Sequence, residues 1–148
     1  MKTKLPVSGI MTRRMASVQP EDNLECVRQI FERHGFHHIP VVRSGKLSGI
    51  VSYTDYLRII HEYFSNLESK PASEKLLQTL TVEDMMTENP VCLKPEDTVE
   101  TALRVFRENQ FHALPVTDVQ GKLLGILTTY DVMKVFEDTM APEHSYSE

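Results

Sequence analysis

The stretch that decides the fold is Gly125-Ile126-Leu127-Thr128-Thr129-Tyr130-Asp131, because its pattern occurs earlier as Gly49-Ile50-Val51-Ser52-Tyr53-Thr54-Asp55. In both copies an apolar pair and a hydroxyl residue follow a glycine, and an aspartate comes three residues later. The apolar pair is typical of the end of a buried strand, and apolar residues after the aspartate recur at helical spacing. The sequence therefore predicts, twice, a strand that passes directly into a helix.

The hydroxyl at each predicted junction has two possible functions. Ser52 or Thr128 can cap the helix, whose first backbone N–H groups lack partners within it. The same N–H groups can instead bind a phosphate, with Asp55 or Asp131 one turn into the helix and available to sugar hydroxyls. Both interpretations remain open at this point.

The junction is part of a longer unit that occurs twice along the chain. Met11-Thr12 recurs as Met86-Thr87, and Phe36-His37 recurs as Phe111-His112. The spacing is constant until one extra residue enters the loop at Asp118–Gln120. Each copy predicts a short strand, a helix, two paired strands and a second helix.

Local signals place the elements of each copy. The short strands are expected near 16–18 and 91–93, and a hairpin turn over 43–46 joins strands 37–42 and 47–51. Asp22 with Glu25, and Asp97 with Glu100, fit a capping box at the start of the first helix of each copy. Gly35 is expected to end the first of these helices.

Size and charge restrict the class of protein. The chain has 148 residues, 41% of them hydrophobic, and a net charge of −5 without a basic stripe, which argues against nucleic acid as the main partner. No apolar run is long enough to span a membrane, and no signal peptide is visible. The two cysteines, Cys26 and Cys92, predict reduced thiols in a cytoplasmic protein, with Cys26 in the core.

These segments resemble a tandem of CBS domains, also called a Bateman module. The shared features are Met-Thr before the first strand, His-x-h-Pro-Val-h before the hairpin and Gly-h-h-[Ser/Thr]-x-x-Asp after it, where h is apolar. The resemblance implies an α/β (α+β) fold of two repeats packed sheet to sheet with pseudo-twofold symmetry. It divides the chain into repeat 1 over 7–62, a linker and lead-in helix over 63–81, repeat 2 over 82–137 and a loose tail over 138–148.

The family implies a regulatory module without catalysis of its own. Its ligands contain adenosine: AMP, ADP or ATP are favoured here, and S-adenosylmethionine or NAD is possible. The module is expected to form a homodimer, which is a flat disc of four repeats, and to signal to an unknown target protein. No metal is expected.

The resemblance also implies two clefts per chain, each built from both repeats. The aspartates would hold ribose hydroxyls, and the histidines match phosphate-contacting positions in the γ subunit of AMP-activated protein kinase. The first cleft groups Thr12, Phe36, His37 and His38 with Thr128, Tyr130 and Asp131; the second groups Thr87, Phe111 and His112 with Ser52, Thr54 and Asp55.

Two departures from the pattern affect the expected ligand. Tyr130 stands where the first repeat has Thr54, so it narrows its cleft or stacks on an aromatic ligand. Ala113 stands where the first repeat has His38 and the kinase subunit has arginine. Positive charge for binding phosphate is therefore weak in both clefts, which favours a ligand with few phosphates or one whose phosphates are bound partly by a neighbouring chain.

The sequence also bears on three other functions: a metal site, an enzyme and a ligand-free scaffold. His34, His37 and His38 could suggest a metal site, but Gly35 interrupts the helix that would align them and no carboxylate or cysteine lies at ligand spacing. An enzyme is disfavoured, since no acid, base or nucleophile constellation is visible. The main alternative is a ligand-free dimerisation scaffold. Its interface would be formed by apolar residues of the second helices: Ile59, Ile60, Tyr63, Phe64, Met133, Val135 and Phe136.

Overall fold

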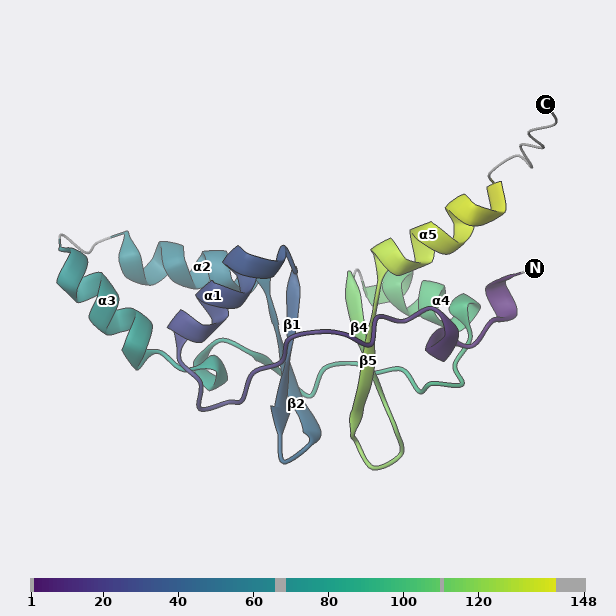
Figure 1. Cartoon of the computed structure of the whole chain (residues 1–148), viewed down its shortest axis with the longest axis horizontal. Helices are drawn as coiled ribbons and strands as arrows, with labels where there is room; N and C mark the ends of the chain where they lie inside the picture. The colour runs from purple at the N-terminus through teal and green to yellow at the C-terminus, as the bar shows by residue number, and fades with distance from the viewer. Residues whose placement is uncertain (1, 66–68, 110, 141–148) are drawn as a thin grey trace. The chain divides into compact units, whose positions relative to one another are not determined.

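The structure, a computed structural model, describes residues 2–65, 69–109 and 111–140 (Figure 1). Its helices are α1 (Leu24–His34), α2 (Tyr53–Phe64), α3 (Lys70–Thr79), α4 (Val99–Asn109) and α5 (Thr129–Met140). Its strands are β1 (His38–Arg43), β2 (Lys46–Ser52), β3 (Thr87–Glu88), β4 (Ala113–Thr117) and β5 (Leu123–Thr128). Short 3-10 turns lie at Lys2–Lys4, Val7–Gly9 and Val82–Asp84.

The predicted α/β fold of two repeats is confirmed by the order of these elements. α1, β1, β2 and α2 recur as α4, β4, β5 and α5. The short first strand of each copy is reduced to one bridging residue: Val18 bridges to Val41, and Leu93 bridges to Val116, both in parallel. The β1–β2 turn consists of Ser44 and Gly45, both at positive φ, as a tight hairpin requires.

The chain divides into two compact units. The first-repeat unit comprises Met15–Val91 and Gln120–Leu123, and contains the sheet β1-β2-β3 with α1, α2 and α3. The second-repeat unit draws its described residues from Met1–Arg14, Cys92–Val119 and Leu124–Glu148, and contains β4 and β5 with α4 and α5.

The segment that leads into each repeat packs in the unit of the other repeat. Thr12, at the start of the chain, pairs with Ile126 of β5 through two backbone hydrogen bonds of 2.9 Å. Thr87, which leads into the second repeat, pairs with Ile50 of β2. Each sheet is therefore completed by residues far away along the chain.

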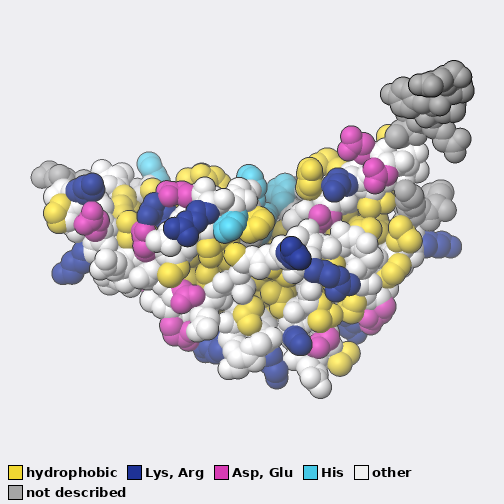
Figure 2. Space-filling view, viewed as in Figure 1, with side chains coloured by type: hydrophobic (Ala, Val, Ile, Leu, Met, Phe, Trp, Pro, Cys, Tyr) yellow, Lys and Arg dark blue, Asp and Glu magenta, His cyan; other side chains and the backbone are white. Residues whose placement is uncertain are grey.

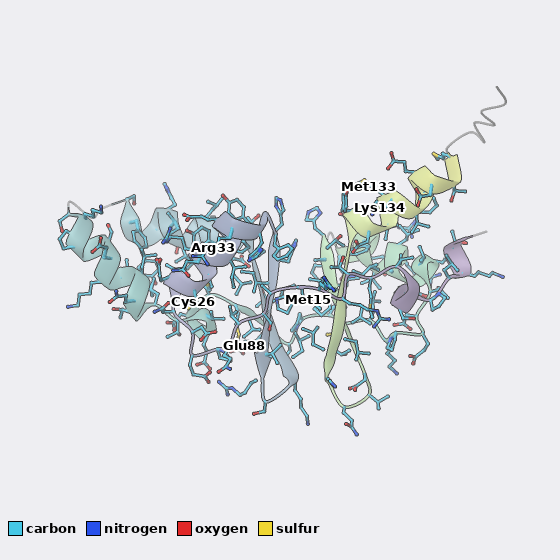
Figure 3. All side chains as sticks on the ribbon, viewed as in Figure 1. Met15, Cys26, Arg33, Glu88, Met133 and Lys134 are labelled. Atoms are coloured by element: carbon cyan, nitrogen blue, oxygen red, sulfur yellow. The ribbon has the colours of Figure 1, made fainter. Side chains whose placement is uncertain are left out.

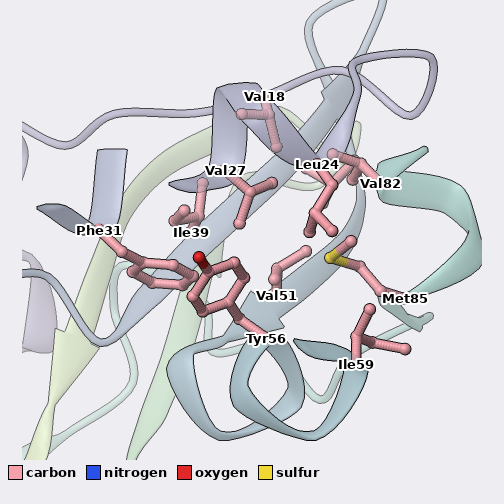
Figure 4. Close-up of a cluster of buried hydrophobic side chains, with 11 residues drawn as sticks. Val18, Leu24, Val27, Phe31, Ile39, Val51, Tyr56, Ile59, Val82 and Met85 are labelled. Atoms are coloured by element: carbon pink, nitrogen blue, oxygen red, sulfur yellow. The ribbon is translucent and has the colours of Figure 1, made fainter. Parts of the chain in front are cut away.

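The core of the first-repeat unit lies between its sheet and its helices (Figure 4). The alternate residues Ile39 and Val41 of β1 and Val51 of β2 are fully buried, as expected for strands with one face against helices. The other buried side chains come from the bridging residue Val18, the helices, the 3-10 turn and the residue that follows it: Val18, Leu24, Val27, Phe31, Tyr56, Ile59, Val82 and Met85.

The core of the second-repeat unit has the same composition in outline. Leu114 and Leu127 are fully buried at the centre of β4 and β5. They pack with buried residues from the chain start and the two helices: Val7, Met11, Val99, Ala102, Phe106 and Val132.

The predicted capping boxes at α1 and α4 are wrong by one residue. α1 begins at Leu24, so its cap is Asn23, whose side chain accepts a hydrogen bond of 3.1 Å from the backbone N–H three residues on. Thr98 makes the equivalent 3.1 Å contact at α4. Asp22 and Asp97 instead each accept a backbone N–H in the preceding turn, at 2.8 Å.

Three other expectations differ from the structure. Within the linker and lead-in helix predicted over 63–81, residues 63–64 belong to α2, and the lead-in helix α3 begins at Lys70, because Ser69 caps it and proline is tolerated in a first turn. α5 continues to Met140, so 138–140 of the predicted tail are helical, while 141–148 lie outside the described residues. Cys26 is exposed on α1 and not in the core, since Leu24 and Val27 form the buried face (Figure 3).

An ion pair in the first turns of α1 gives a pH-dependent prediction. Arg28 donates to Glu25, and this hydrogen bond holds the pKa of the Glu25 carboxyl below its ordinary value of 4.5. A lowered pKa in the folded state adds stability above the unfolded-state pKa, and this stability is lost as the pH falls through the folded-state pKa.

We therefore expect Glu25→Gln to lower the free energy of unfolding by about 0.5 kcal/mol at pH 7. The difference from wild type should shrink as urea unfolding is repeated below pH 4.5. Glu100→Gln is the control, because Glu100 has the same place in α4 while Leu103 stands at the position of Arg28. A loss for Glu25→Gln that persists at low pH would contradict the expectation.

Candidate functional site

Asp131, in the first turn of α5, is held by its own helix start. Its Oδ2 accepts hydrogen bonds from the Thr128 backbone N–H at 2.9 Å and from the Thr128 hydroxyl at 3.1 Å. Thr128 Oγ1 in turn accepts the Asp131 backbone N–H at 3.2 Å. The hydroxyl therefore caps α5, and the aspartate completes the reciprocal contact of a capping box.

Thr12 supplies the third hydrogen bond to this carboxylate. Its hydroxyl donates to Asp131 Oδ1 at 3.1 Å, and the Thr12–Ile126 bridge holds the Thr12 backbone beside the end of β5. A carboxylate has about four acceptor positions, so three bonds leave capacity on Oδ1. The structure thus brings together Thr12, Thr128 and Asp131, which are partly buried.

The equivalent junction in the first-repeat unit has a different electrostatic character. Ser52 Oγ caps α2 by accepting the Asp55 backbone N–H at 3.0 Å. Asp55 Oδ1 accepts a hydrogen bond from the Arg58 guanidinium at 3.2 Å, where Asp131 Oδ1 takes the neutral Thr12 hydroxyl. Thr87 lies at the same sheet edge through its pairing with Ile50.

The histidines preceding β1 and β4 lie beside these helix starts through their backbones. The carbonyl of His37 accepts the Tyr53 N–H at 2.7 Å, and the carbonyl of His112 accepts the Thr129 N–H at 3.0 Å. One N–H at the start of each helix is therefore used within the protein. Both imidazoles are exposed and available to a ligand.

Aromatic rings line the first-repeat junction. The His37 ring lies edge-on to Tyr53, with 5.9 Å between ring centroids, and His34 stacks on Phe36 at 5.3 Å. Tyr53 also contacts Tyr56, and burial of Tyr56 raises the pKa of its phenol. Stacked and edge-on rings of this kind can form a platform for a planar base.

Several predicted site residues are accessible rather than packed. Tyr130 is 64% exposed and Phe111 is 38% exposed, so neither ring is part of the core. Thr54 is also exposed, whereas His38 and Phe36 are half-buried.

The predicted grouping of Phe36 and His37 with Asp131, and of Phe111 and His112 with Asp55, joins residues of different units and remains a prediction. Sequence reasoning missed Arg58. The signal was present, because an aspartate and an arginine three positions apart on a helix lie close enough to pair.

The second-repeat unit also has an apolar groove of about 680 Å³ between α4 and α5. Of the exposed residues on α5, Met133 is 60% and Met140 78% accessible; Figure 3 labels Met133. The groove is lined by Leu103, Phe106, Thr129, Val132, Met133, Phe136, Glu137 and Met140.

The described residues also bear on metal binding, membrane spanning and surface charge. Within 2–65, 69–109 and 111–140, no three His, Cys, Asp or Glu side chains are placed to bind a metal ion together. Nor does any described helix combine the length and apolar character that crossing a membrane requires. Figure 2 shows basic and acidic side chains interspersed on the face in view.

Comparison with known proteins identifies the repeats. The family model described as CBS domain matches residues 7–62 and 82–138. The chain belongs to the CBS domain family. Inosine-5'-monophosphate dehydrogenase of Korarchaeum cryptofilum is 32% identical to this CBS pair over 124 residues, which are 84% of the chain and 23% of the dehydrogenase.

Two solved structures resemble the CBS pair over most of its length. CBSX2 of Arabidopsis thaliana in complex with AMP is 28% identical, with a TM-score of 0.76, over 92% of this chain and 98% of that chain. Protein MJ1225 of Methanocaldococcus jannaschii, described as a putative archaeal homolog of the γ subunit of AMP-activated protein kinase, is 26% identical with a TM-score of 0.80. That match covers 92% of this chain and 49% of MJ1225. The chain thus spans less than half of several curated relatives that it matches.

Proposed function

We propose that this CBS pair is a non-catalytic regulatory module that binds an adenosine nucleotide, with AMP, ADP or ATP favoured over S-adenosylmethionine or NAD. The observation that carries the proposal is the repeated carboxylate at a helix start. Asp131 and Asp55 are each the third residue of their helix, in its first turn, beside a capping hydroxyl and an exposed histidine. An ionised carboxylate can accept hydrogen bonds from the hydroxyl groups of ribose.

The chemistry around the carboxylates supports a nucleoside. Hydroxyl groups of Thr12 and Thr128 surround Asp131, and the rings of His37 and Tyr53 lie beside the start of α2. Helix starts favour anions through their N–H groups and dipole. Within the first-repeat unit, the start of α2 therefore has a carboxylate for the sugar, rings for the base and helix N–H groups for the phosphate, while the start of α5 in the second-repeat unit has groups for the sugar and the phosphate.

The likeness to the AMP complex of CBSX2 supports the same ligand class, since the match covers 92% of this chain. Several relatives are enzymes, such as the dehydrogenase, of which this chain matches 23%. A CBS pair can therefore accompany a catalytic domain without being one. We propose that here it transmits ligand binding to an associated chain or target protein, which requires a different affinity for ligand in two arrangements.

The proposal is tested by thermal unfolding of the chain with AMP, ADP, ATP, NAD, S-adenosylmethionine and GTP as a non-adenine control. A ligand at about 100 times its dissociation constant should stabilise the protein by roughly 2.7 kcal/mol. We expect Asp131→Ala and Asp55→Ala each to remove part of this increment, measured against each variant's own ligand-free midpoint.

Two variants control for the loss of a negative charge. These are Asp138→Ala and Glu62→Ala. Asp138 lies on α5 and Glu62 on α2, both at exposed positions away from the helix starts. They should leave the ligand increment unchanged. If no adenine compound stabilises the protein, or if the increment survives in the double variant of Asp55 and Asp131, the nucleotide proposal is wrong.

The apolar groove favours a second candidate, a ligand-free scaffold that forms a homodimer through its second helices. Of the residues predicted for this interface, Tyr63 and Met133 are exposed, at 47% and 60%. Ile59 is in the core, Ile60, Phe64 and Phe136 are partly buried against the two cores, and Val135 is half-buried. Concentration-dependent mass together with unchanged melting in every nucleotide would favour this candidate.

A further inference from the structure

The two helix starts differ in the charge of the group that contacts their aspartate. Asp55 Oδ1 lies 3.2 Å from a guanidinium nitrogen of Arg58. The side chain of Asp131 accepts hydrogen bonds from neutral donors, namely the hydroxyls of Thr12 and Thr128 and one backbone N–H. Lys134 stands one turn after Asp131, where Arg58 stands relative to Asp55.

Arg58 is free to change partner. Its side chain is 57% exposed and that of Asp55 is 25% exposed, and ion pairs this accessible contribute little stability. The guanidinium is a planar group with five donors, a geometry that matches phosphate oxygens two at a time. A ligand that offered ribose hydroxyls to Asp55 and phosphate to Arg58 would satisfy both groups at once.

The ion pair between Asp55 and Arg58 also changes the electrostatic attraction between the start of α2 and a bound anion. With Arg58 present, the charge of Asp55 is balanced, and the positive end of α2 can favour a phosphate. Without Arg58, the Asp55 carboxylate would repel that phosphate. The effect depends on ligand charge, so it would be absent for a nucleoside without phosphate.

We propose that Arg58 is a specificity-determining residue. It makes the group of residues around Asp55 at the start of α2, called the Asp55 half-site, select an adenosine 5′-phosphate over adenosine. This inference rests on the proposed nucleotide-binding function and adds to it the recognition of the phosphate. It assigns no such preference to the Asp131 half-site, where the donors to the carboxylate are uncharged.

The test is isothermal titration of the full chain with AMP and with adenosine, in wild type and in the Asp131→Ala background, where the Asp55 half-site dominates. Arg58→Gln should raise the dissociation constant of AMP about tenfold, within the range for exposed charge-assisted hydrogen bonds, and change that of adenosine less than about twofold. Arg58→Lys should lie between, because it keeps the charge and loses the paired donors.

Lys134→Gln is the matched control, with the same loss of charge one turn after Asp131, and should leave the AMP-to-adenosine preference unchanged. The inference is overturned if Arg58→Gln weakens both ligands equally, or neither. These outcomes differ from failure of the proposed function itself, in which wild type would bind neither AMP nor adenosine and both statements would be wrong.

Discussion

Replacing Gly125 with alanine is expected to destabilise the protein by about 1–3 kcal/mol, since an added methyl group has no space there. A Cβ on Gly125 would lie 2.7 Å from Met11 Sδ and 2.9 Å from the Thr12 backbone oxygen. The sulfur can move, but the oxygen belongs to the bridge between Thr12 and Ile126. The segment around Met11 and Thr12, which leads into the first repeat (the lead segment), must therefore shift as a whole. Thr12 should then lose its hydrogen bond to Asp131.

Urea unfolding measures the loss, and ligand titration shows whether the site is damaged with it. Gly49→Ala should behave alike, because its Cβ would lie 2.7 Å from the Thr87 oxygen. Gly9→Ala is the control, with nothing within 4 Å of the added carbon. Equal stability of Gly125→Ala and Gly9→Ala would show that the lead segment does not pack as described.

The second large effect is expected from Phe31→Ala, at about 3–5 kcal/mol. Phe31 is 7% exposed, and its ring contacts Tyr53 and Tyr56 at centroid distances of 5.2 and 5.3 Å. Removing it should leave a cavity, because Tyr56 is itself buried in this core and both tyrosines are anchored on α2. The same variant should perturb tyrosine fluorescence, which is readable in a chain without tryptophan.

Phe106→Ala removes the same atoms at the equivalent position in α4 and is expected to cost at least about 1 kcal/mol less. Phe106 is similarly buried, at 6%, but it lines the groove, where Thr129 and Val132 stand in place of Tyr53 and Tyr56. Water and neighbouring side chains can enter that open side, so less of the space stays empty. Equal losses in the two variants would mean that the groove is closed in solution.

Local patterns in the sequence predicted much of the fold correctly. The repeat predicted the element order twice, and a cap was one of the two interpretations of the hydroxyl before each second helix; Ser52 and Thr128 do cap their helices. Gly35 ends α1 at a φ of 58°, as predicted. These features depend on residues within a few positions of one another, so the chain's own spacing is sufficient to identify them.

Errors arose where neighbouring residues competed for one role. Asp22 and Asn23 are both good caps, and so are Asp97 and Thr98; the choice depended on where each helix begins. That start is set by Leu24 and Val99, which are fully buried in the two cores. Cys26 was misplaced for a related reason, since an apolar side chain on a helix is buried only if its face meets the sheet.

The sequence alone determined the duplication, the two strand-to-helix junctions and the presence of an aspartate, Asp55 or Asp131, in the first turn of each second helix. Only the tertiary structure decided that Thr12 donates to Asp131, and that a groove opens beside Phe106 while tyrosines fill the space beside Phe31. The physical reason is the distance along the chain between the residues that interact. Capping and periodicity act between residues a turn apart, whereas the partners of Asp131 and the fillers of a groove come from segments that meet only when the sheets are complete.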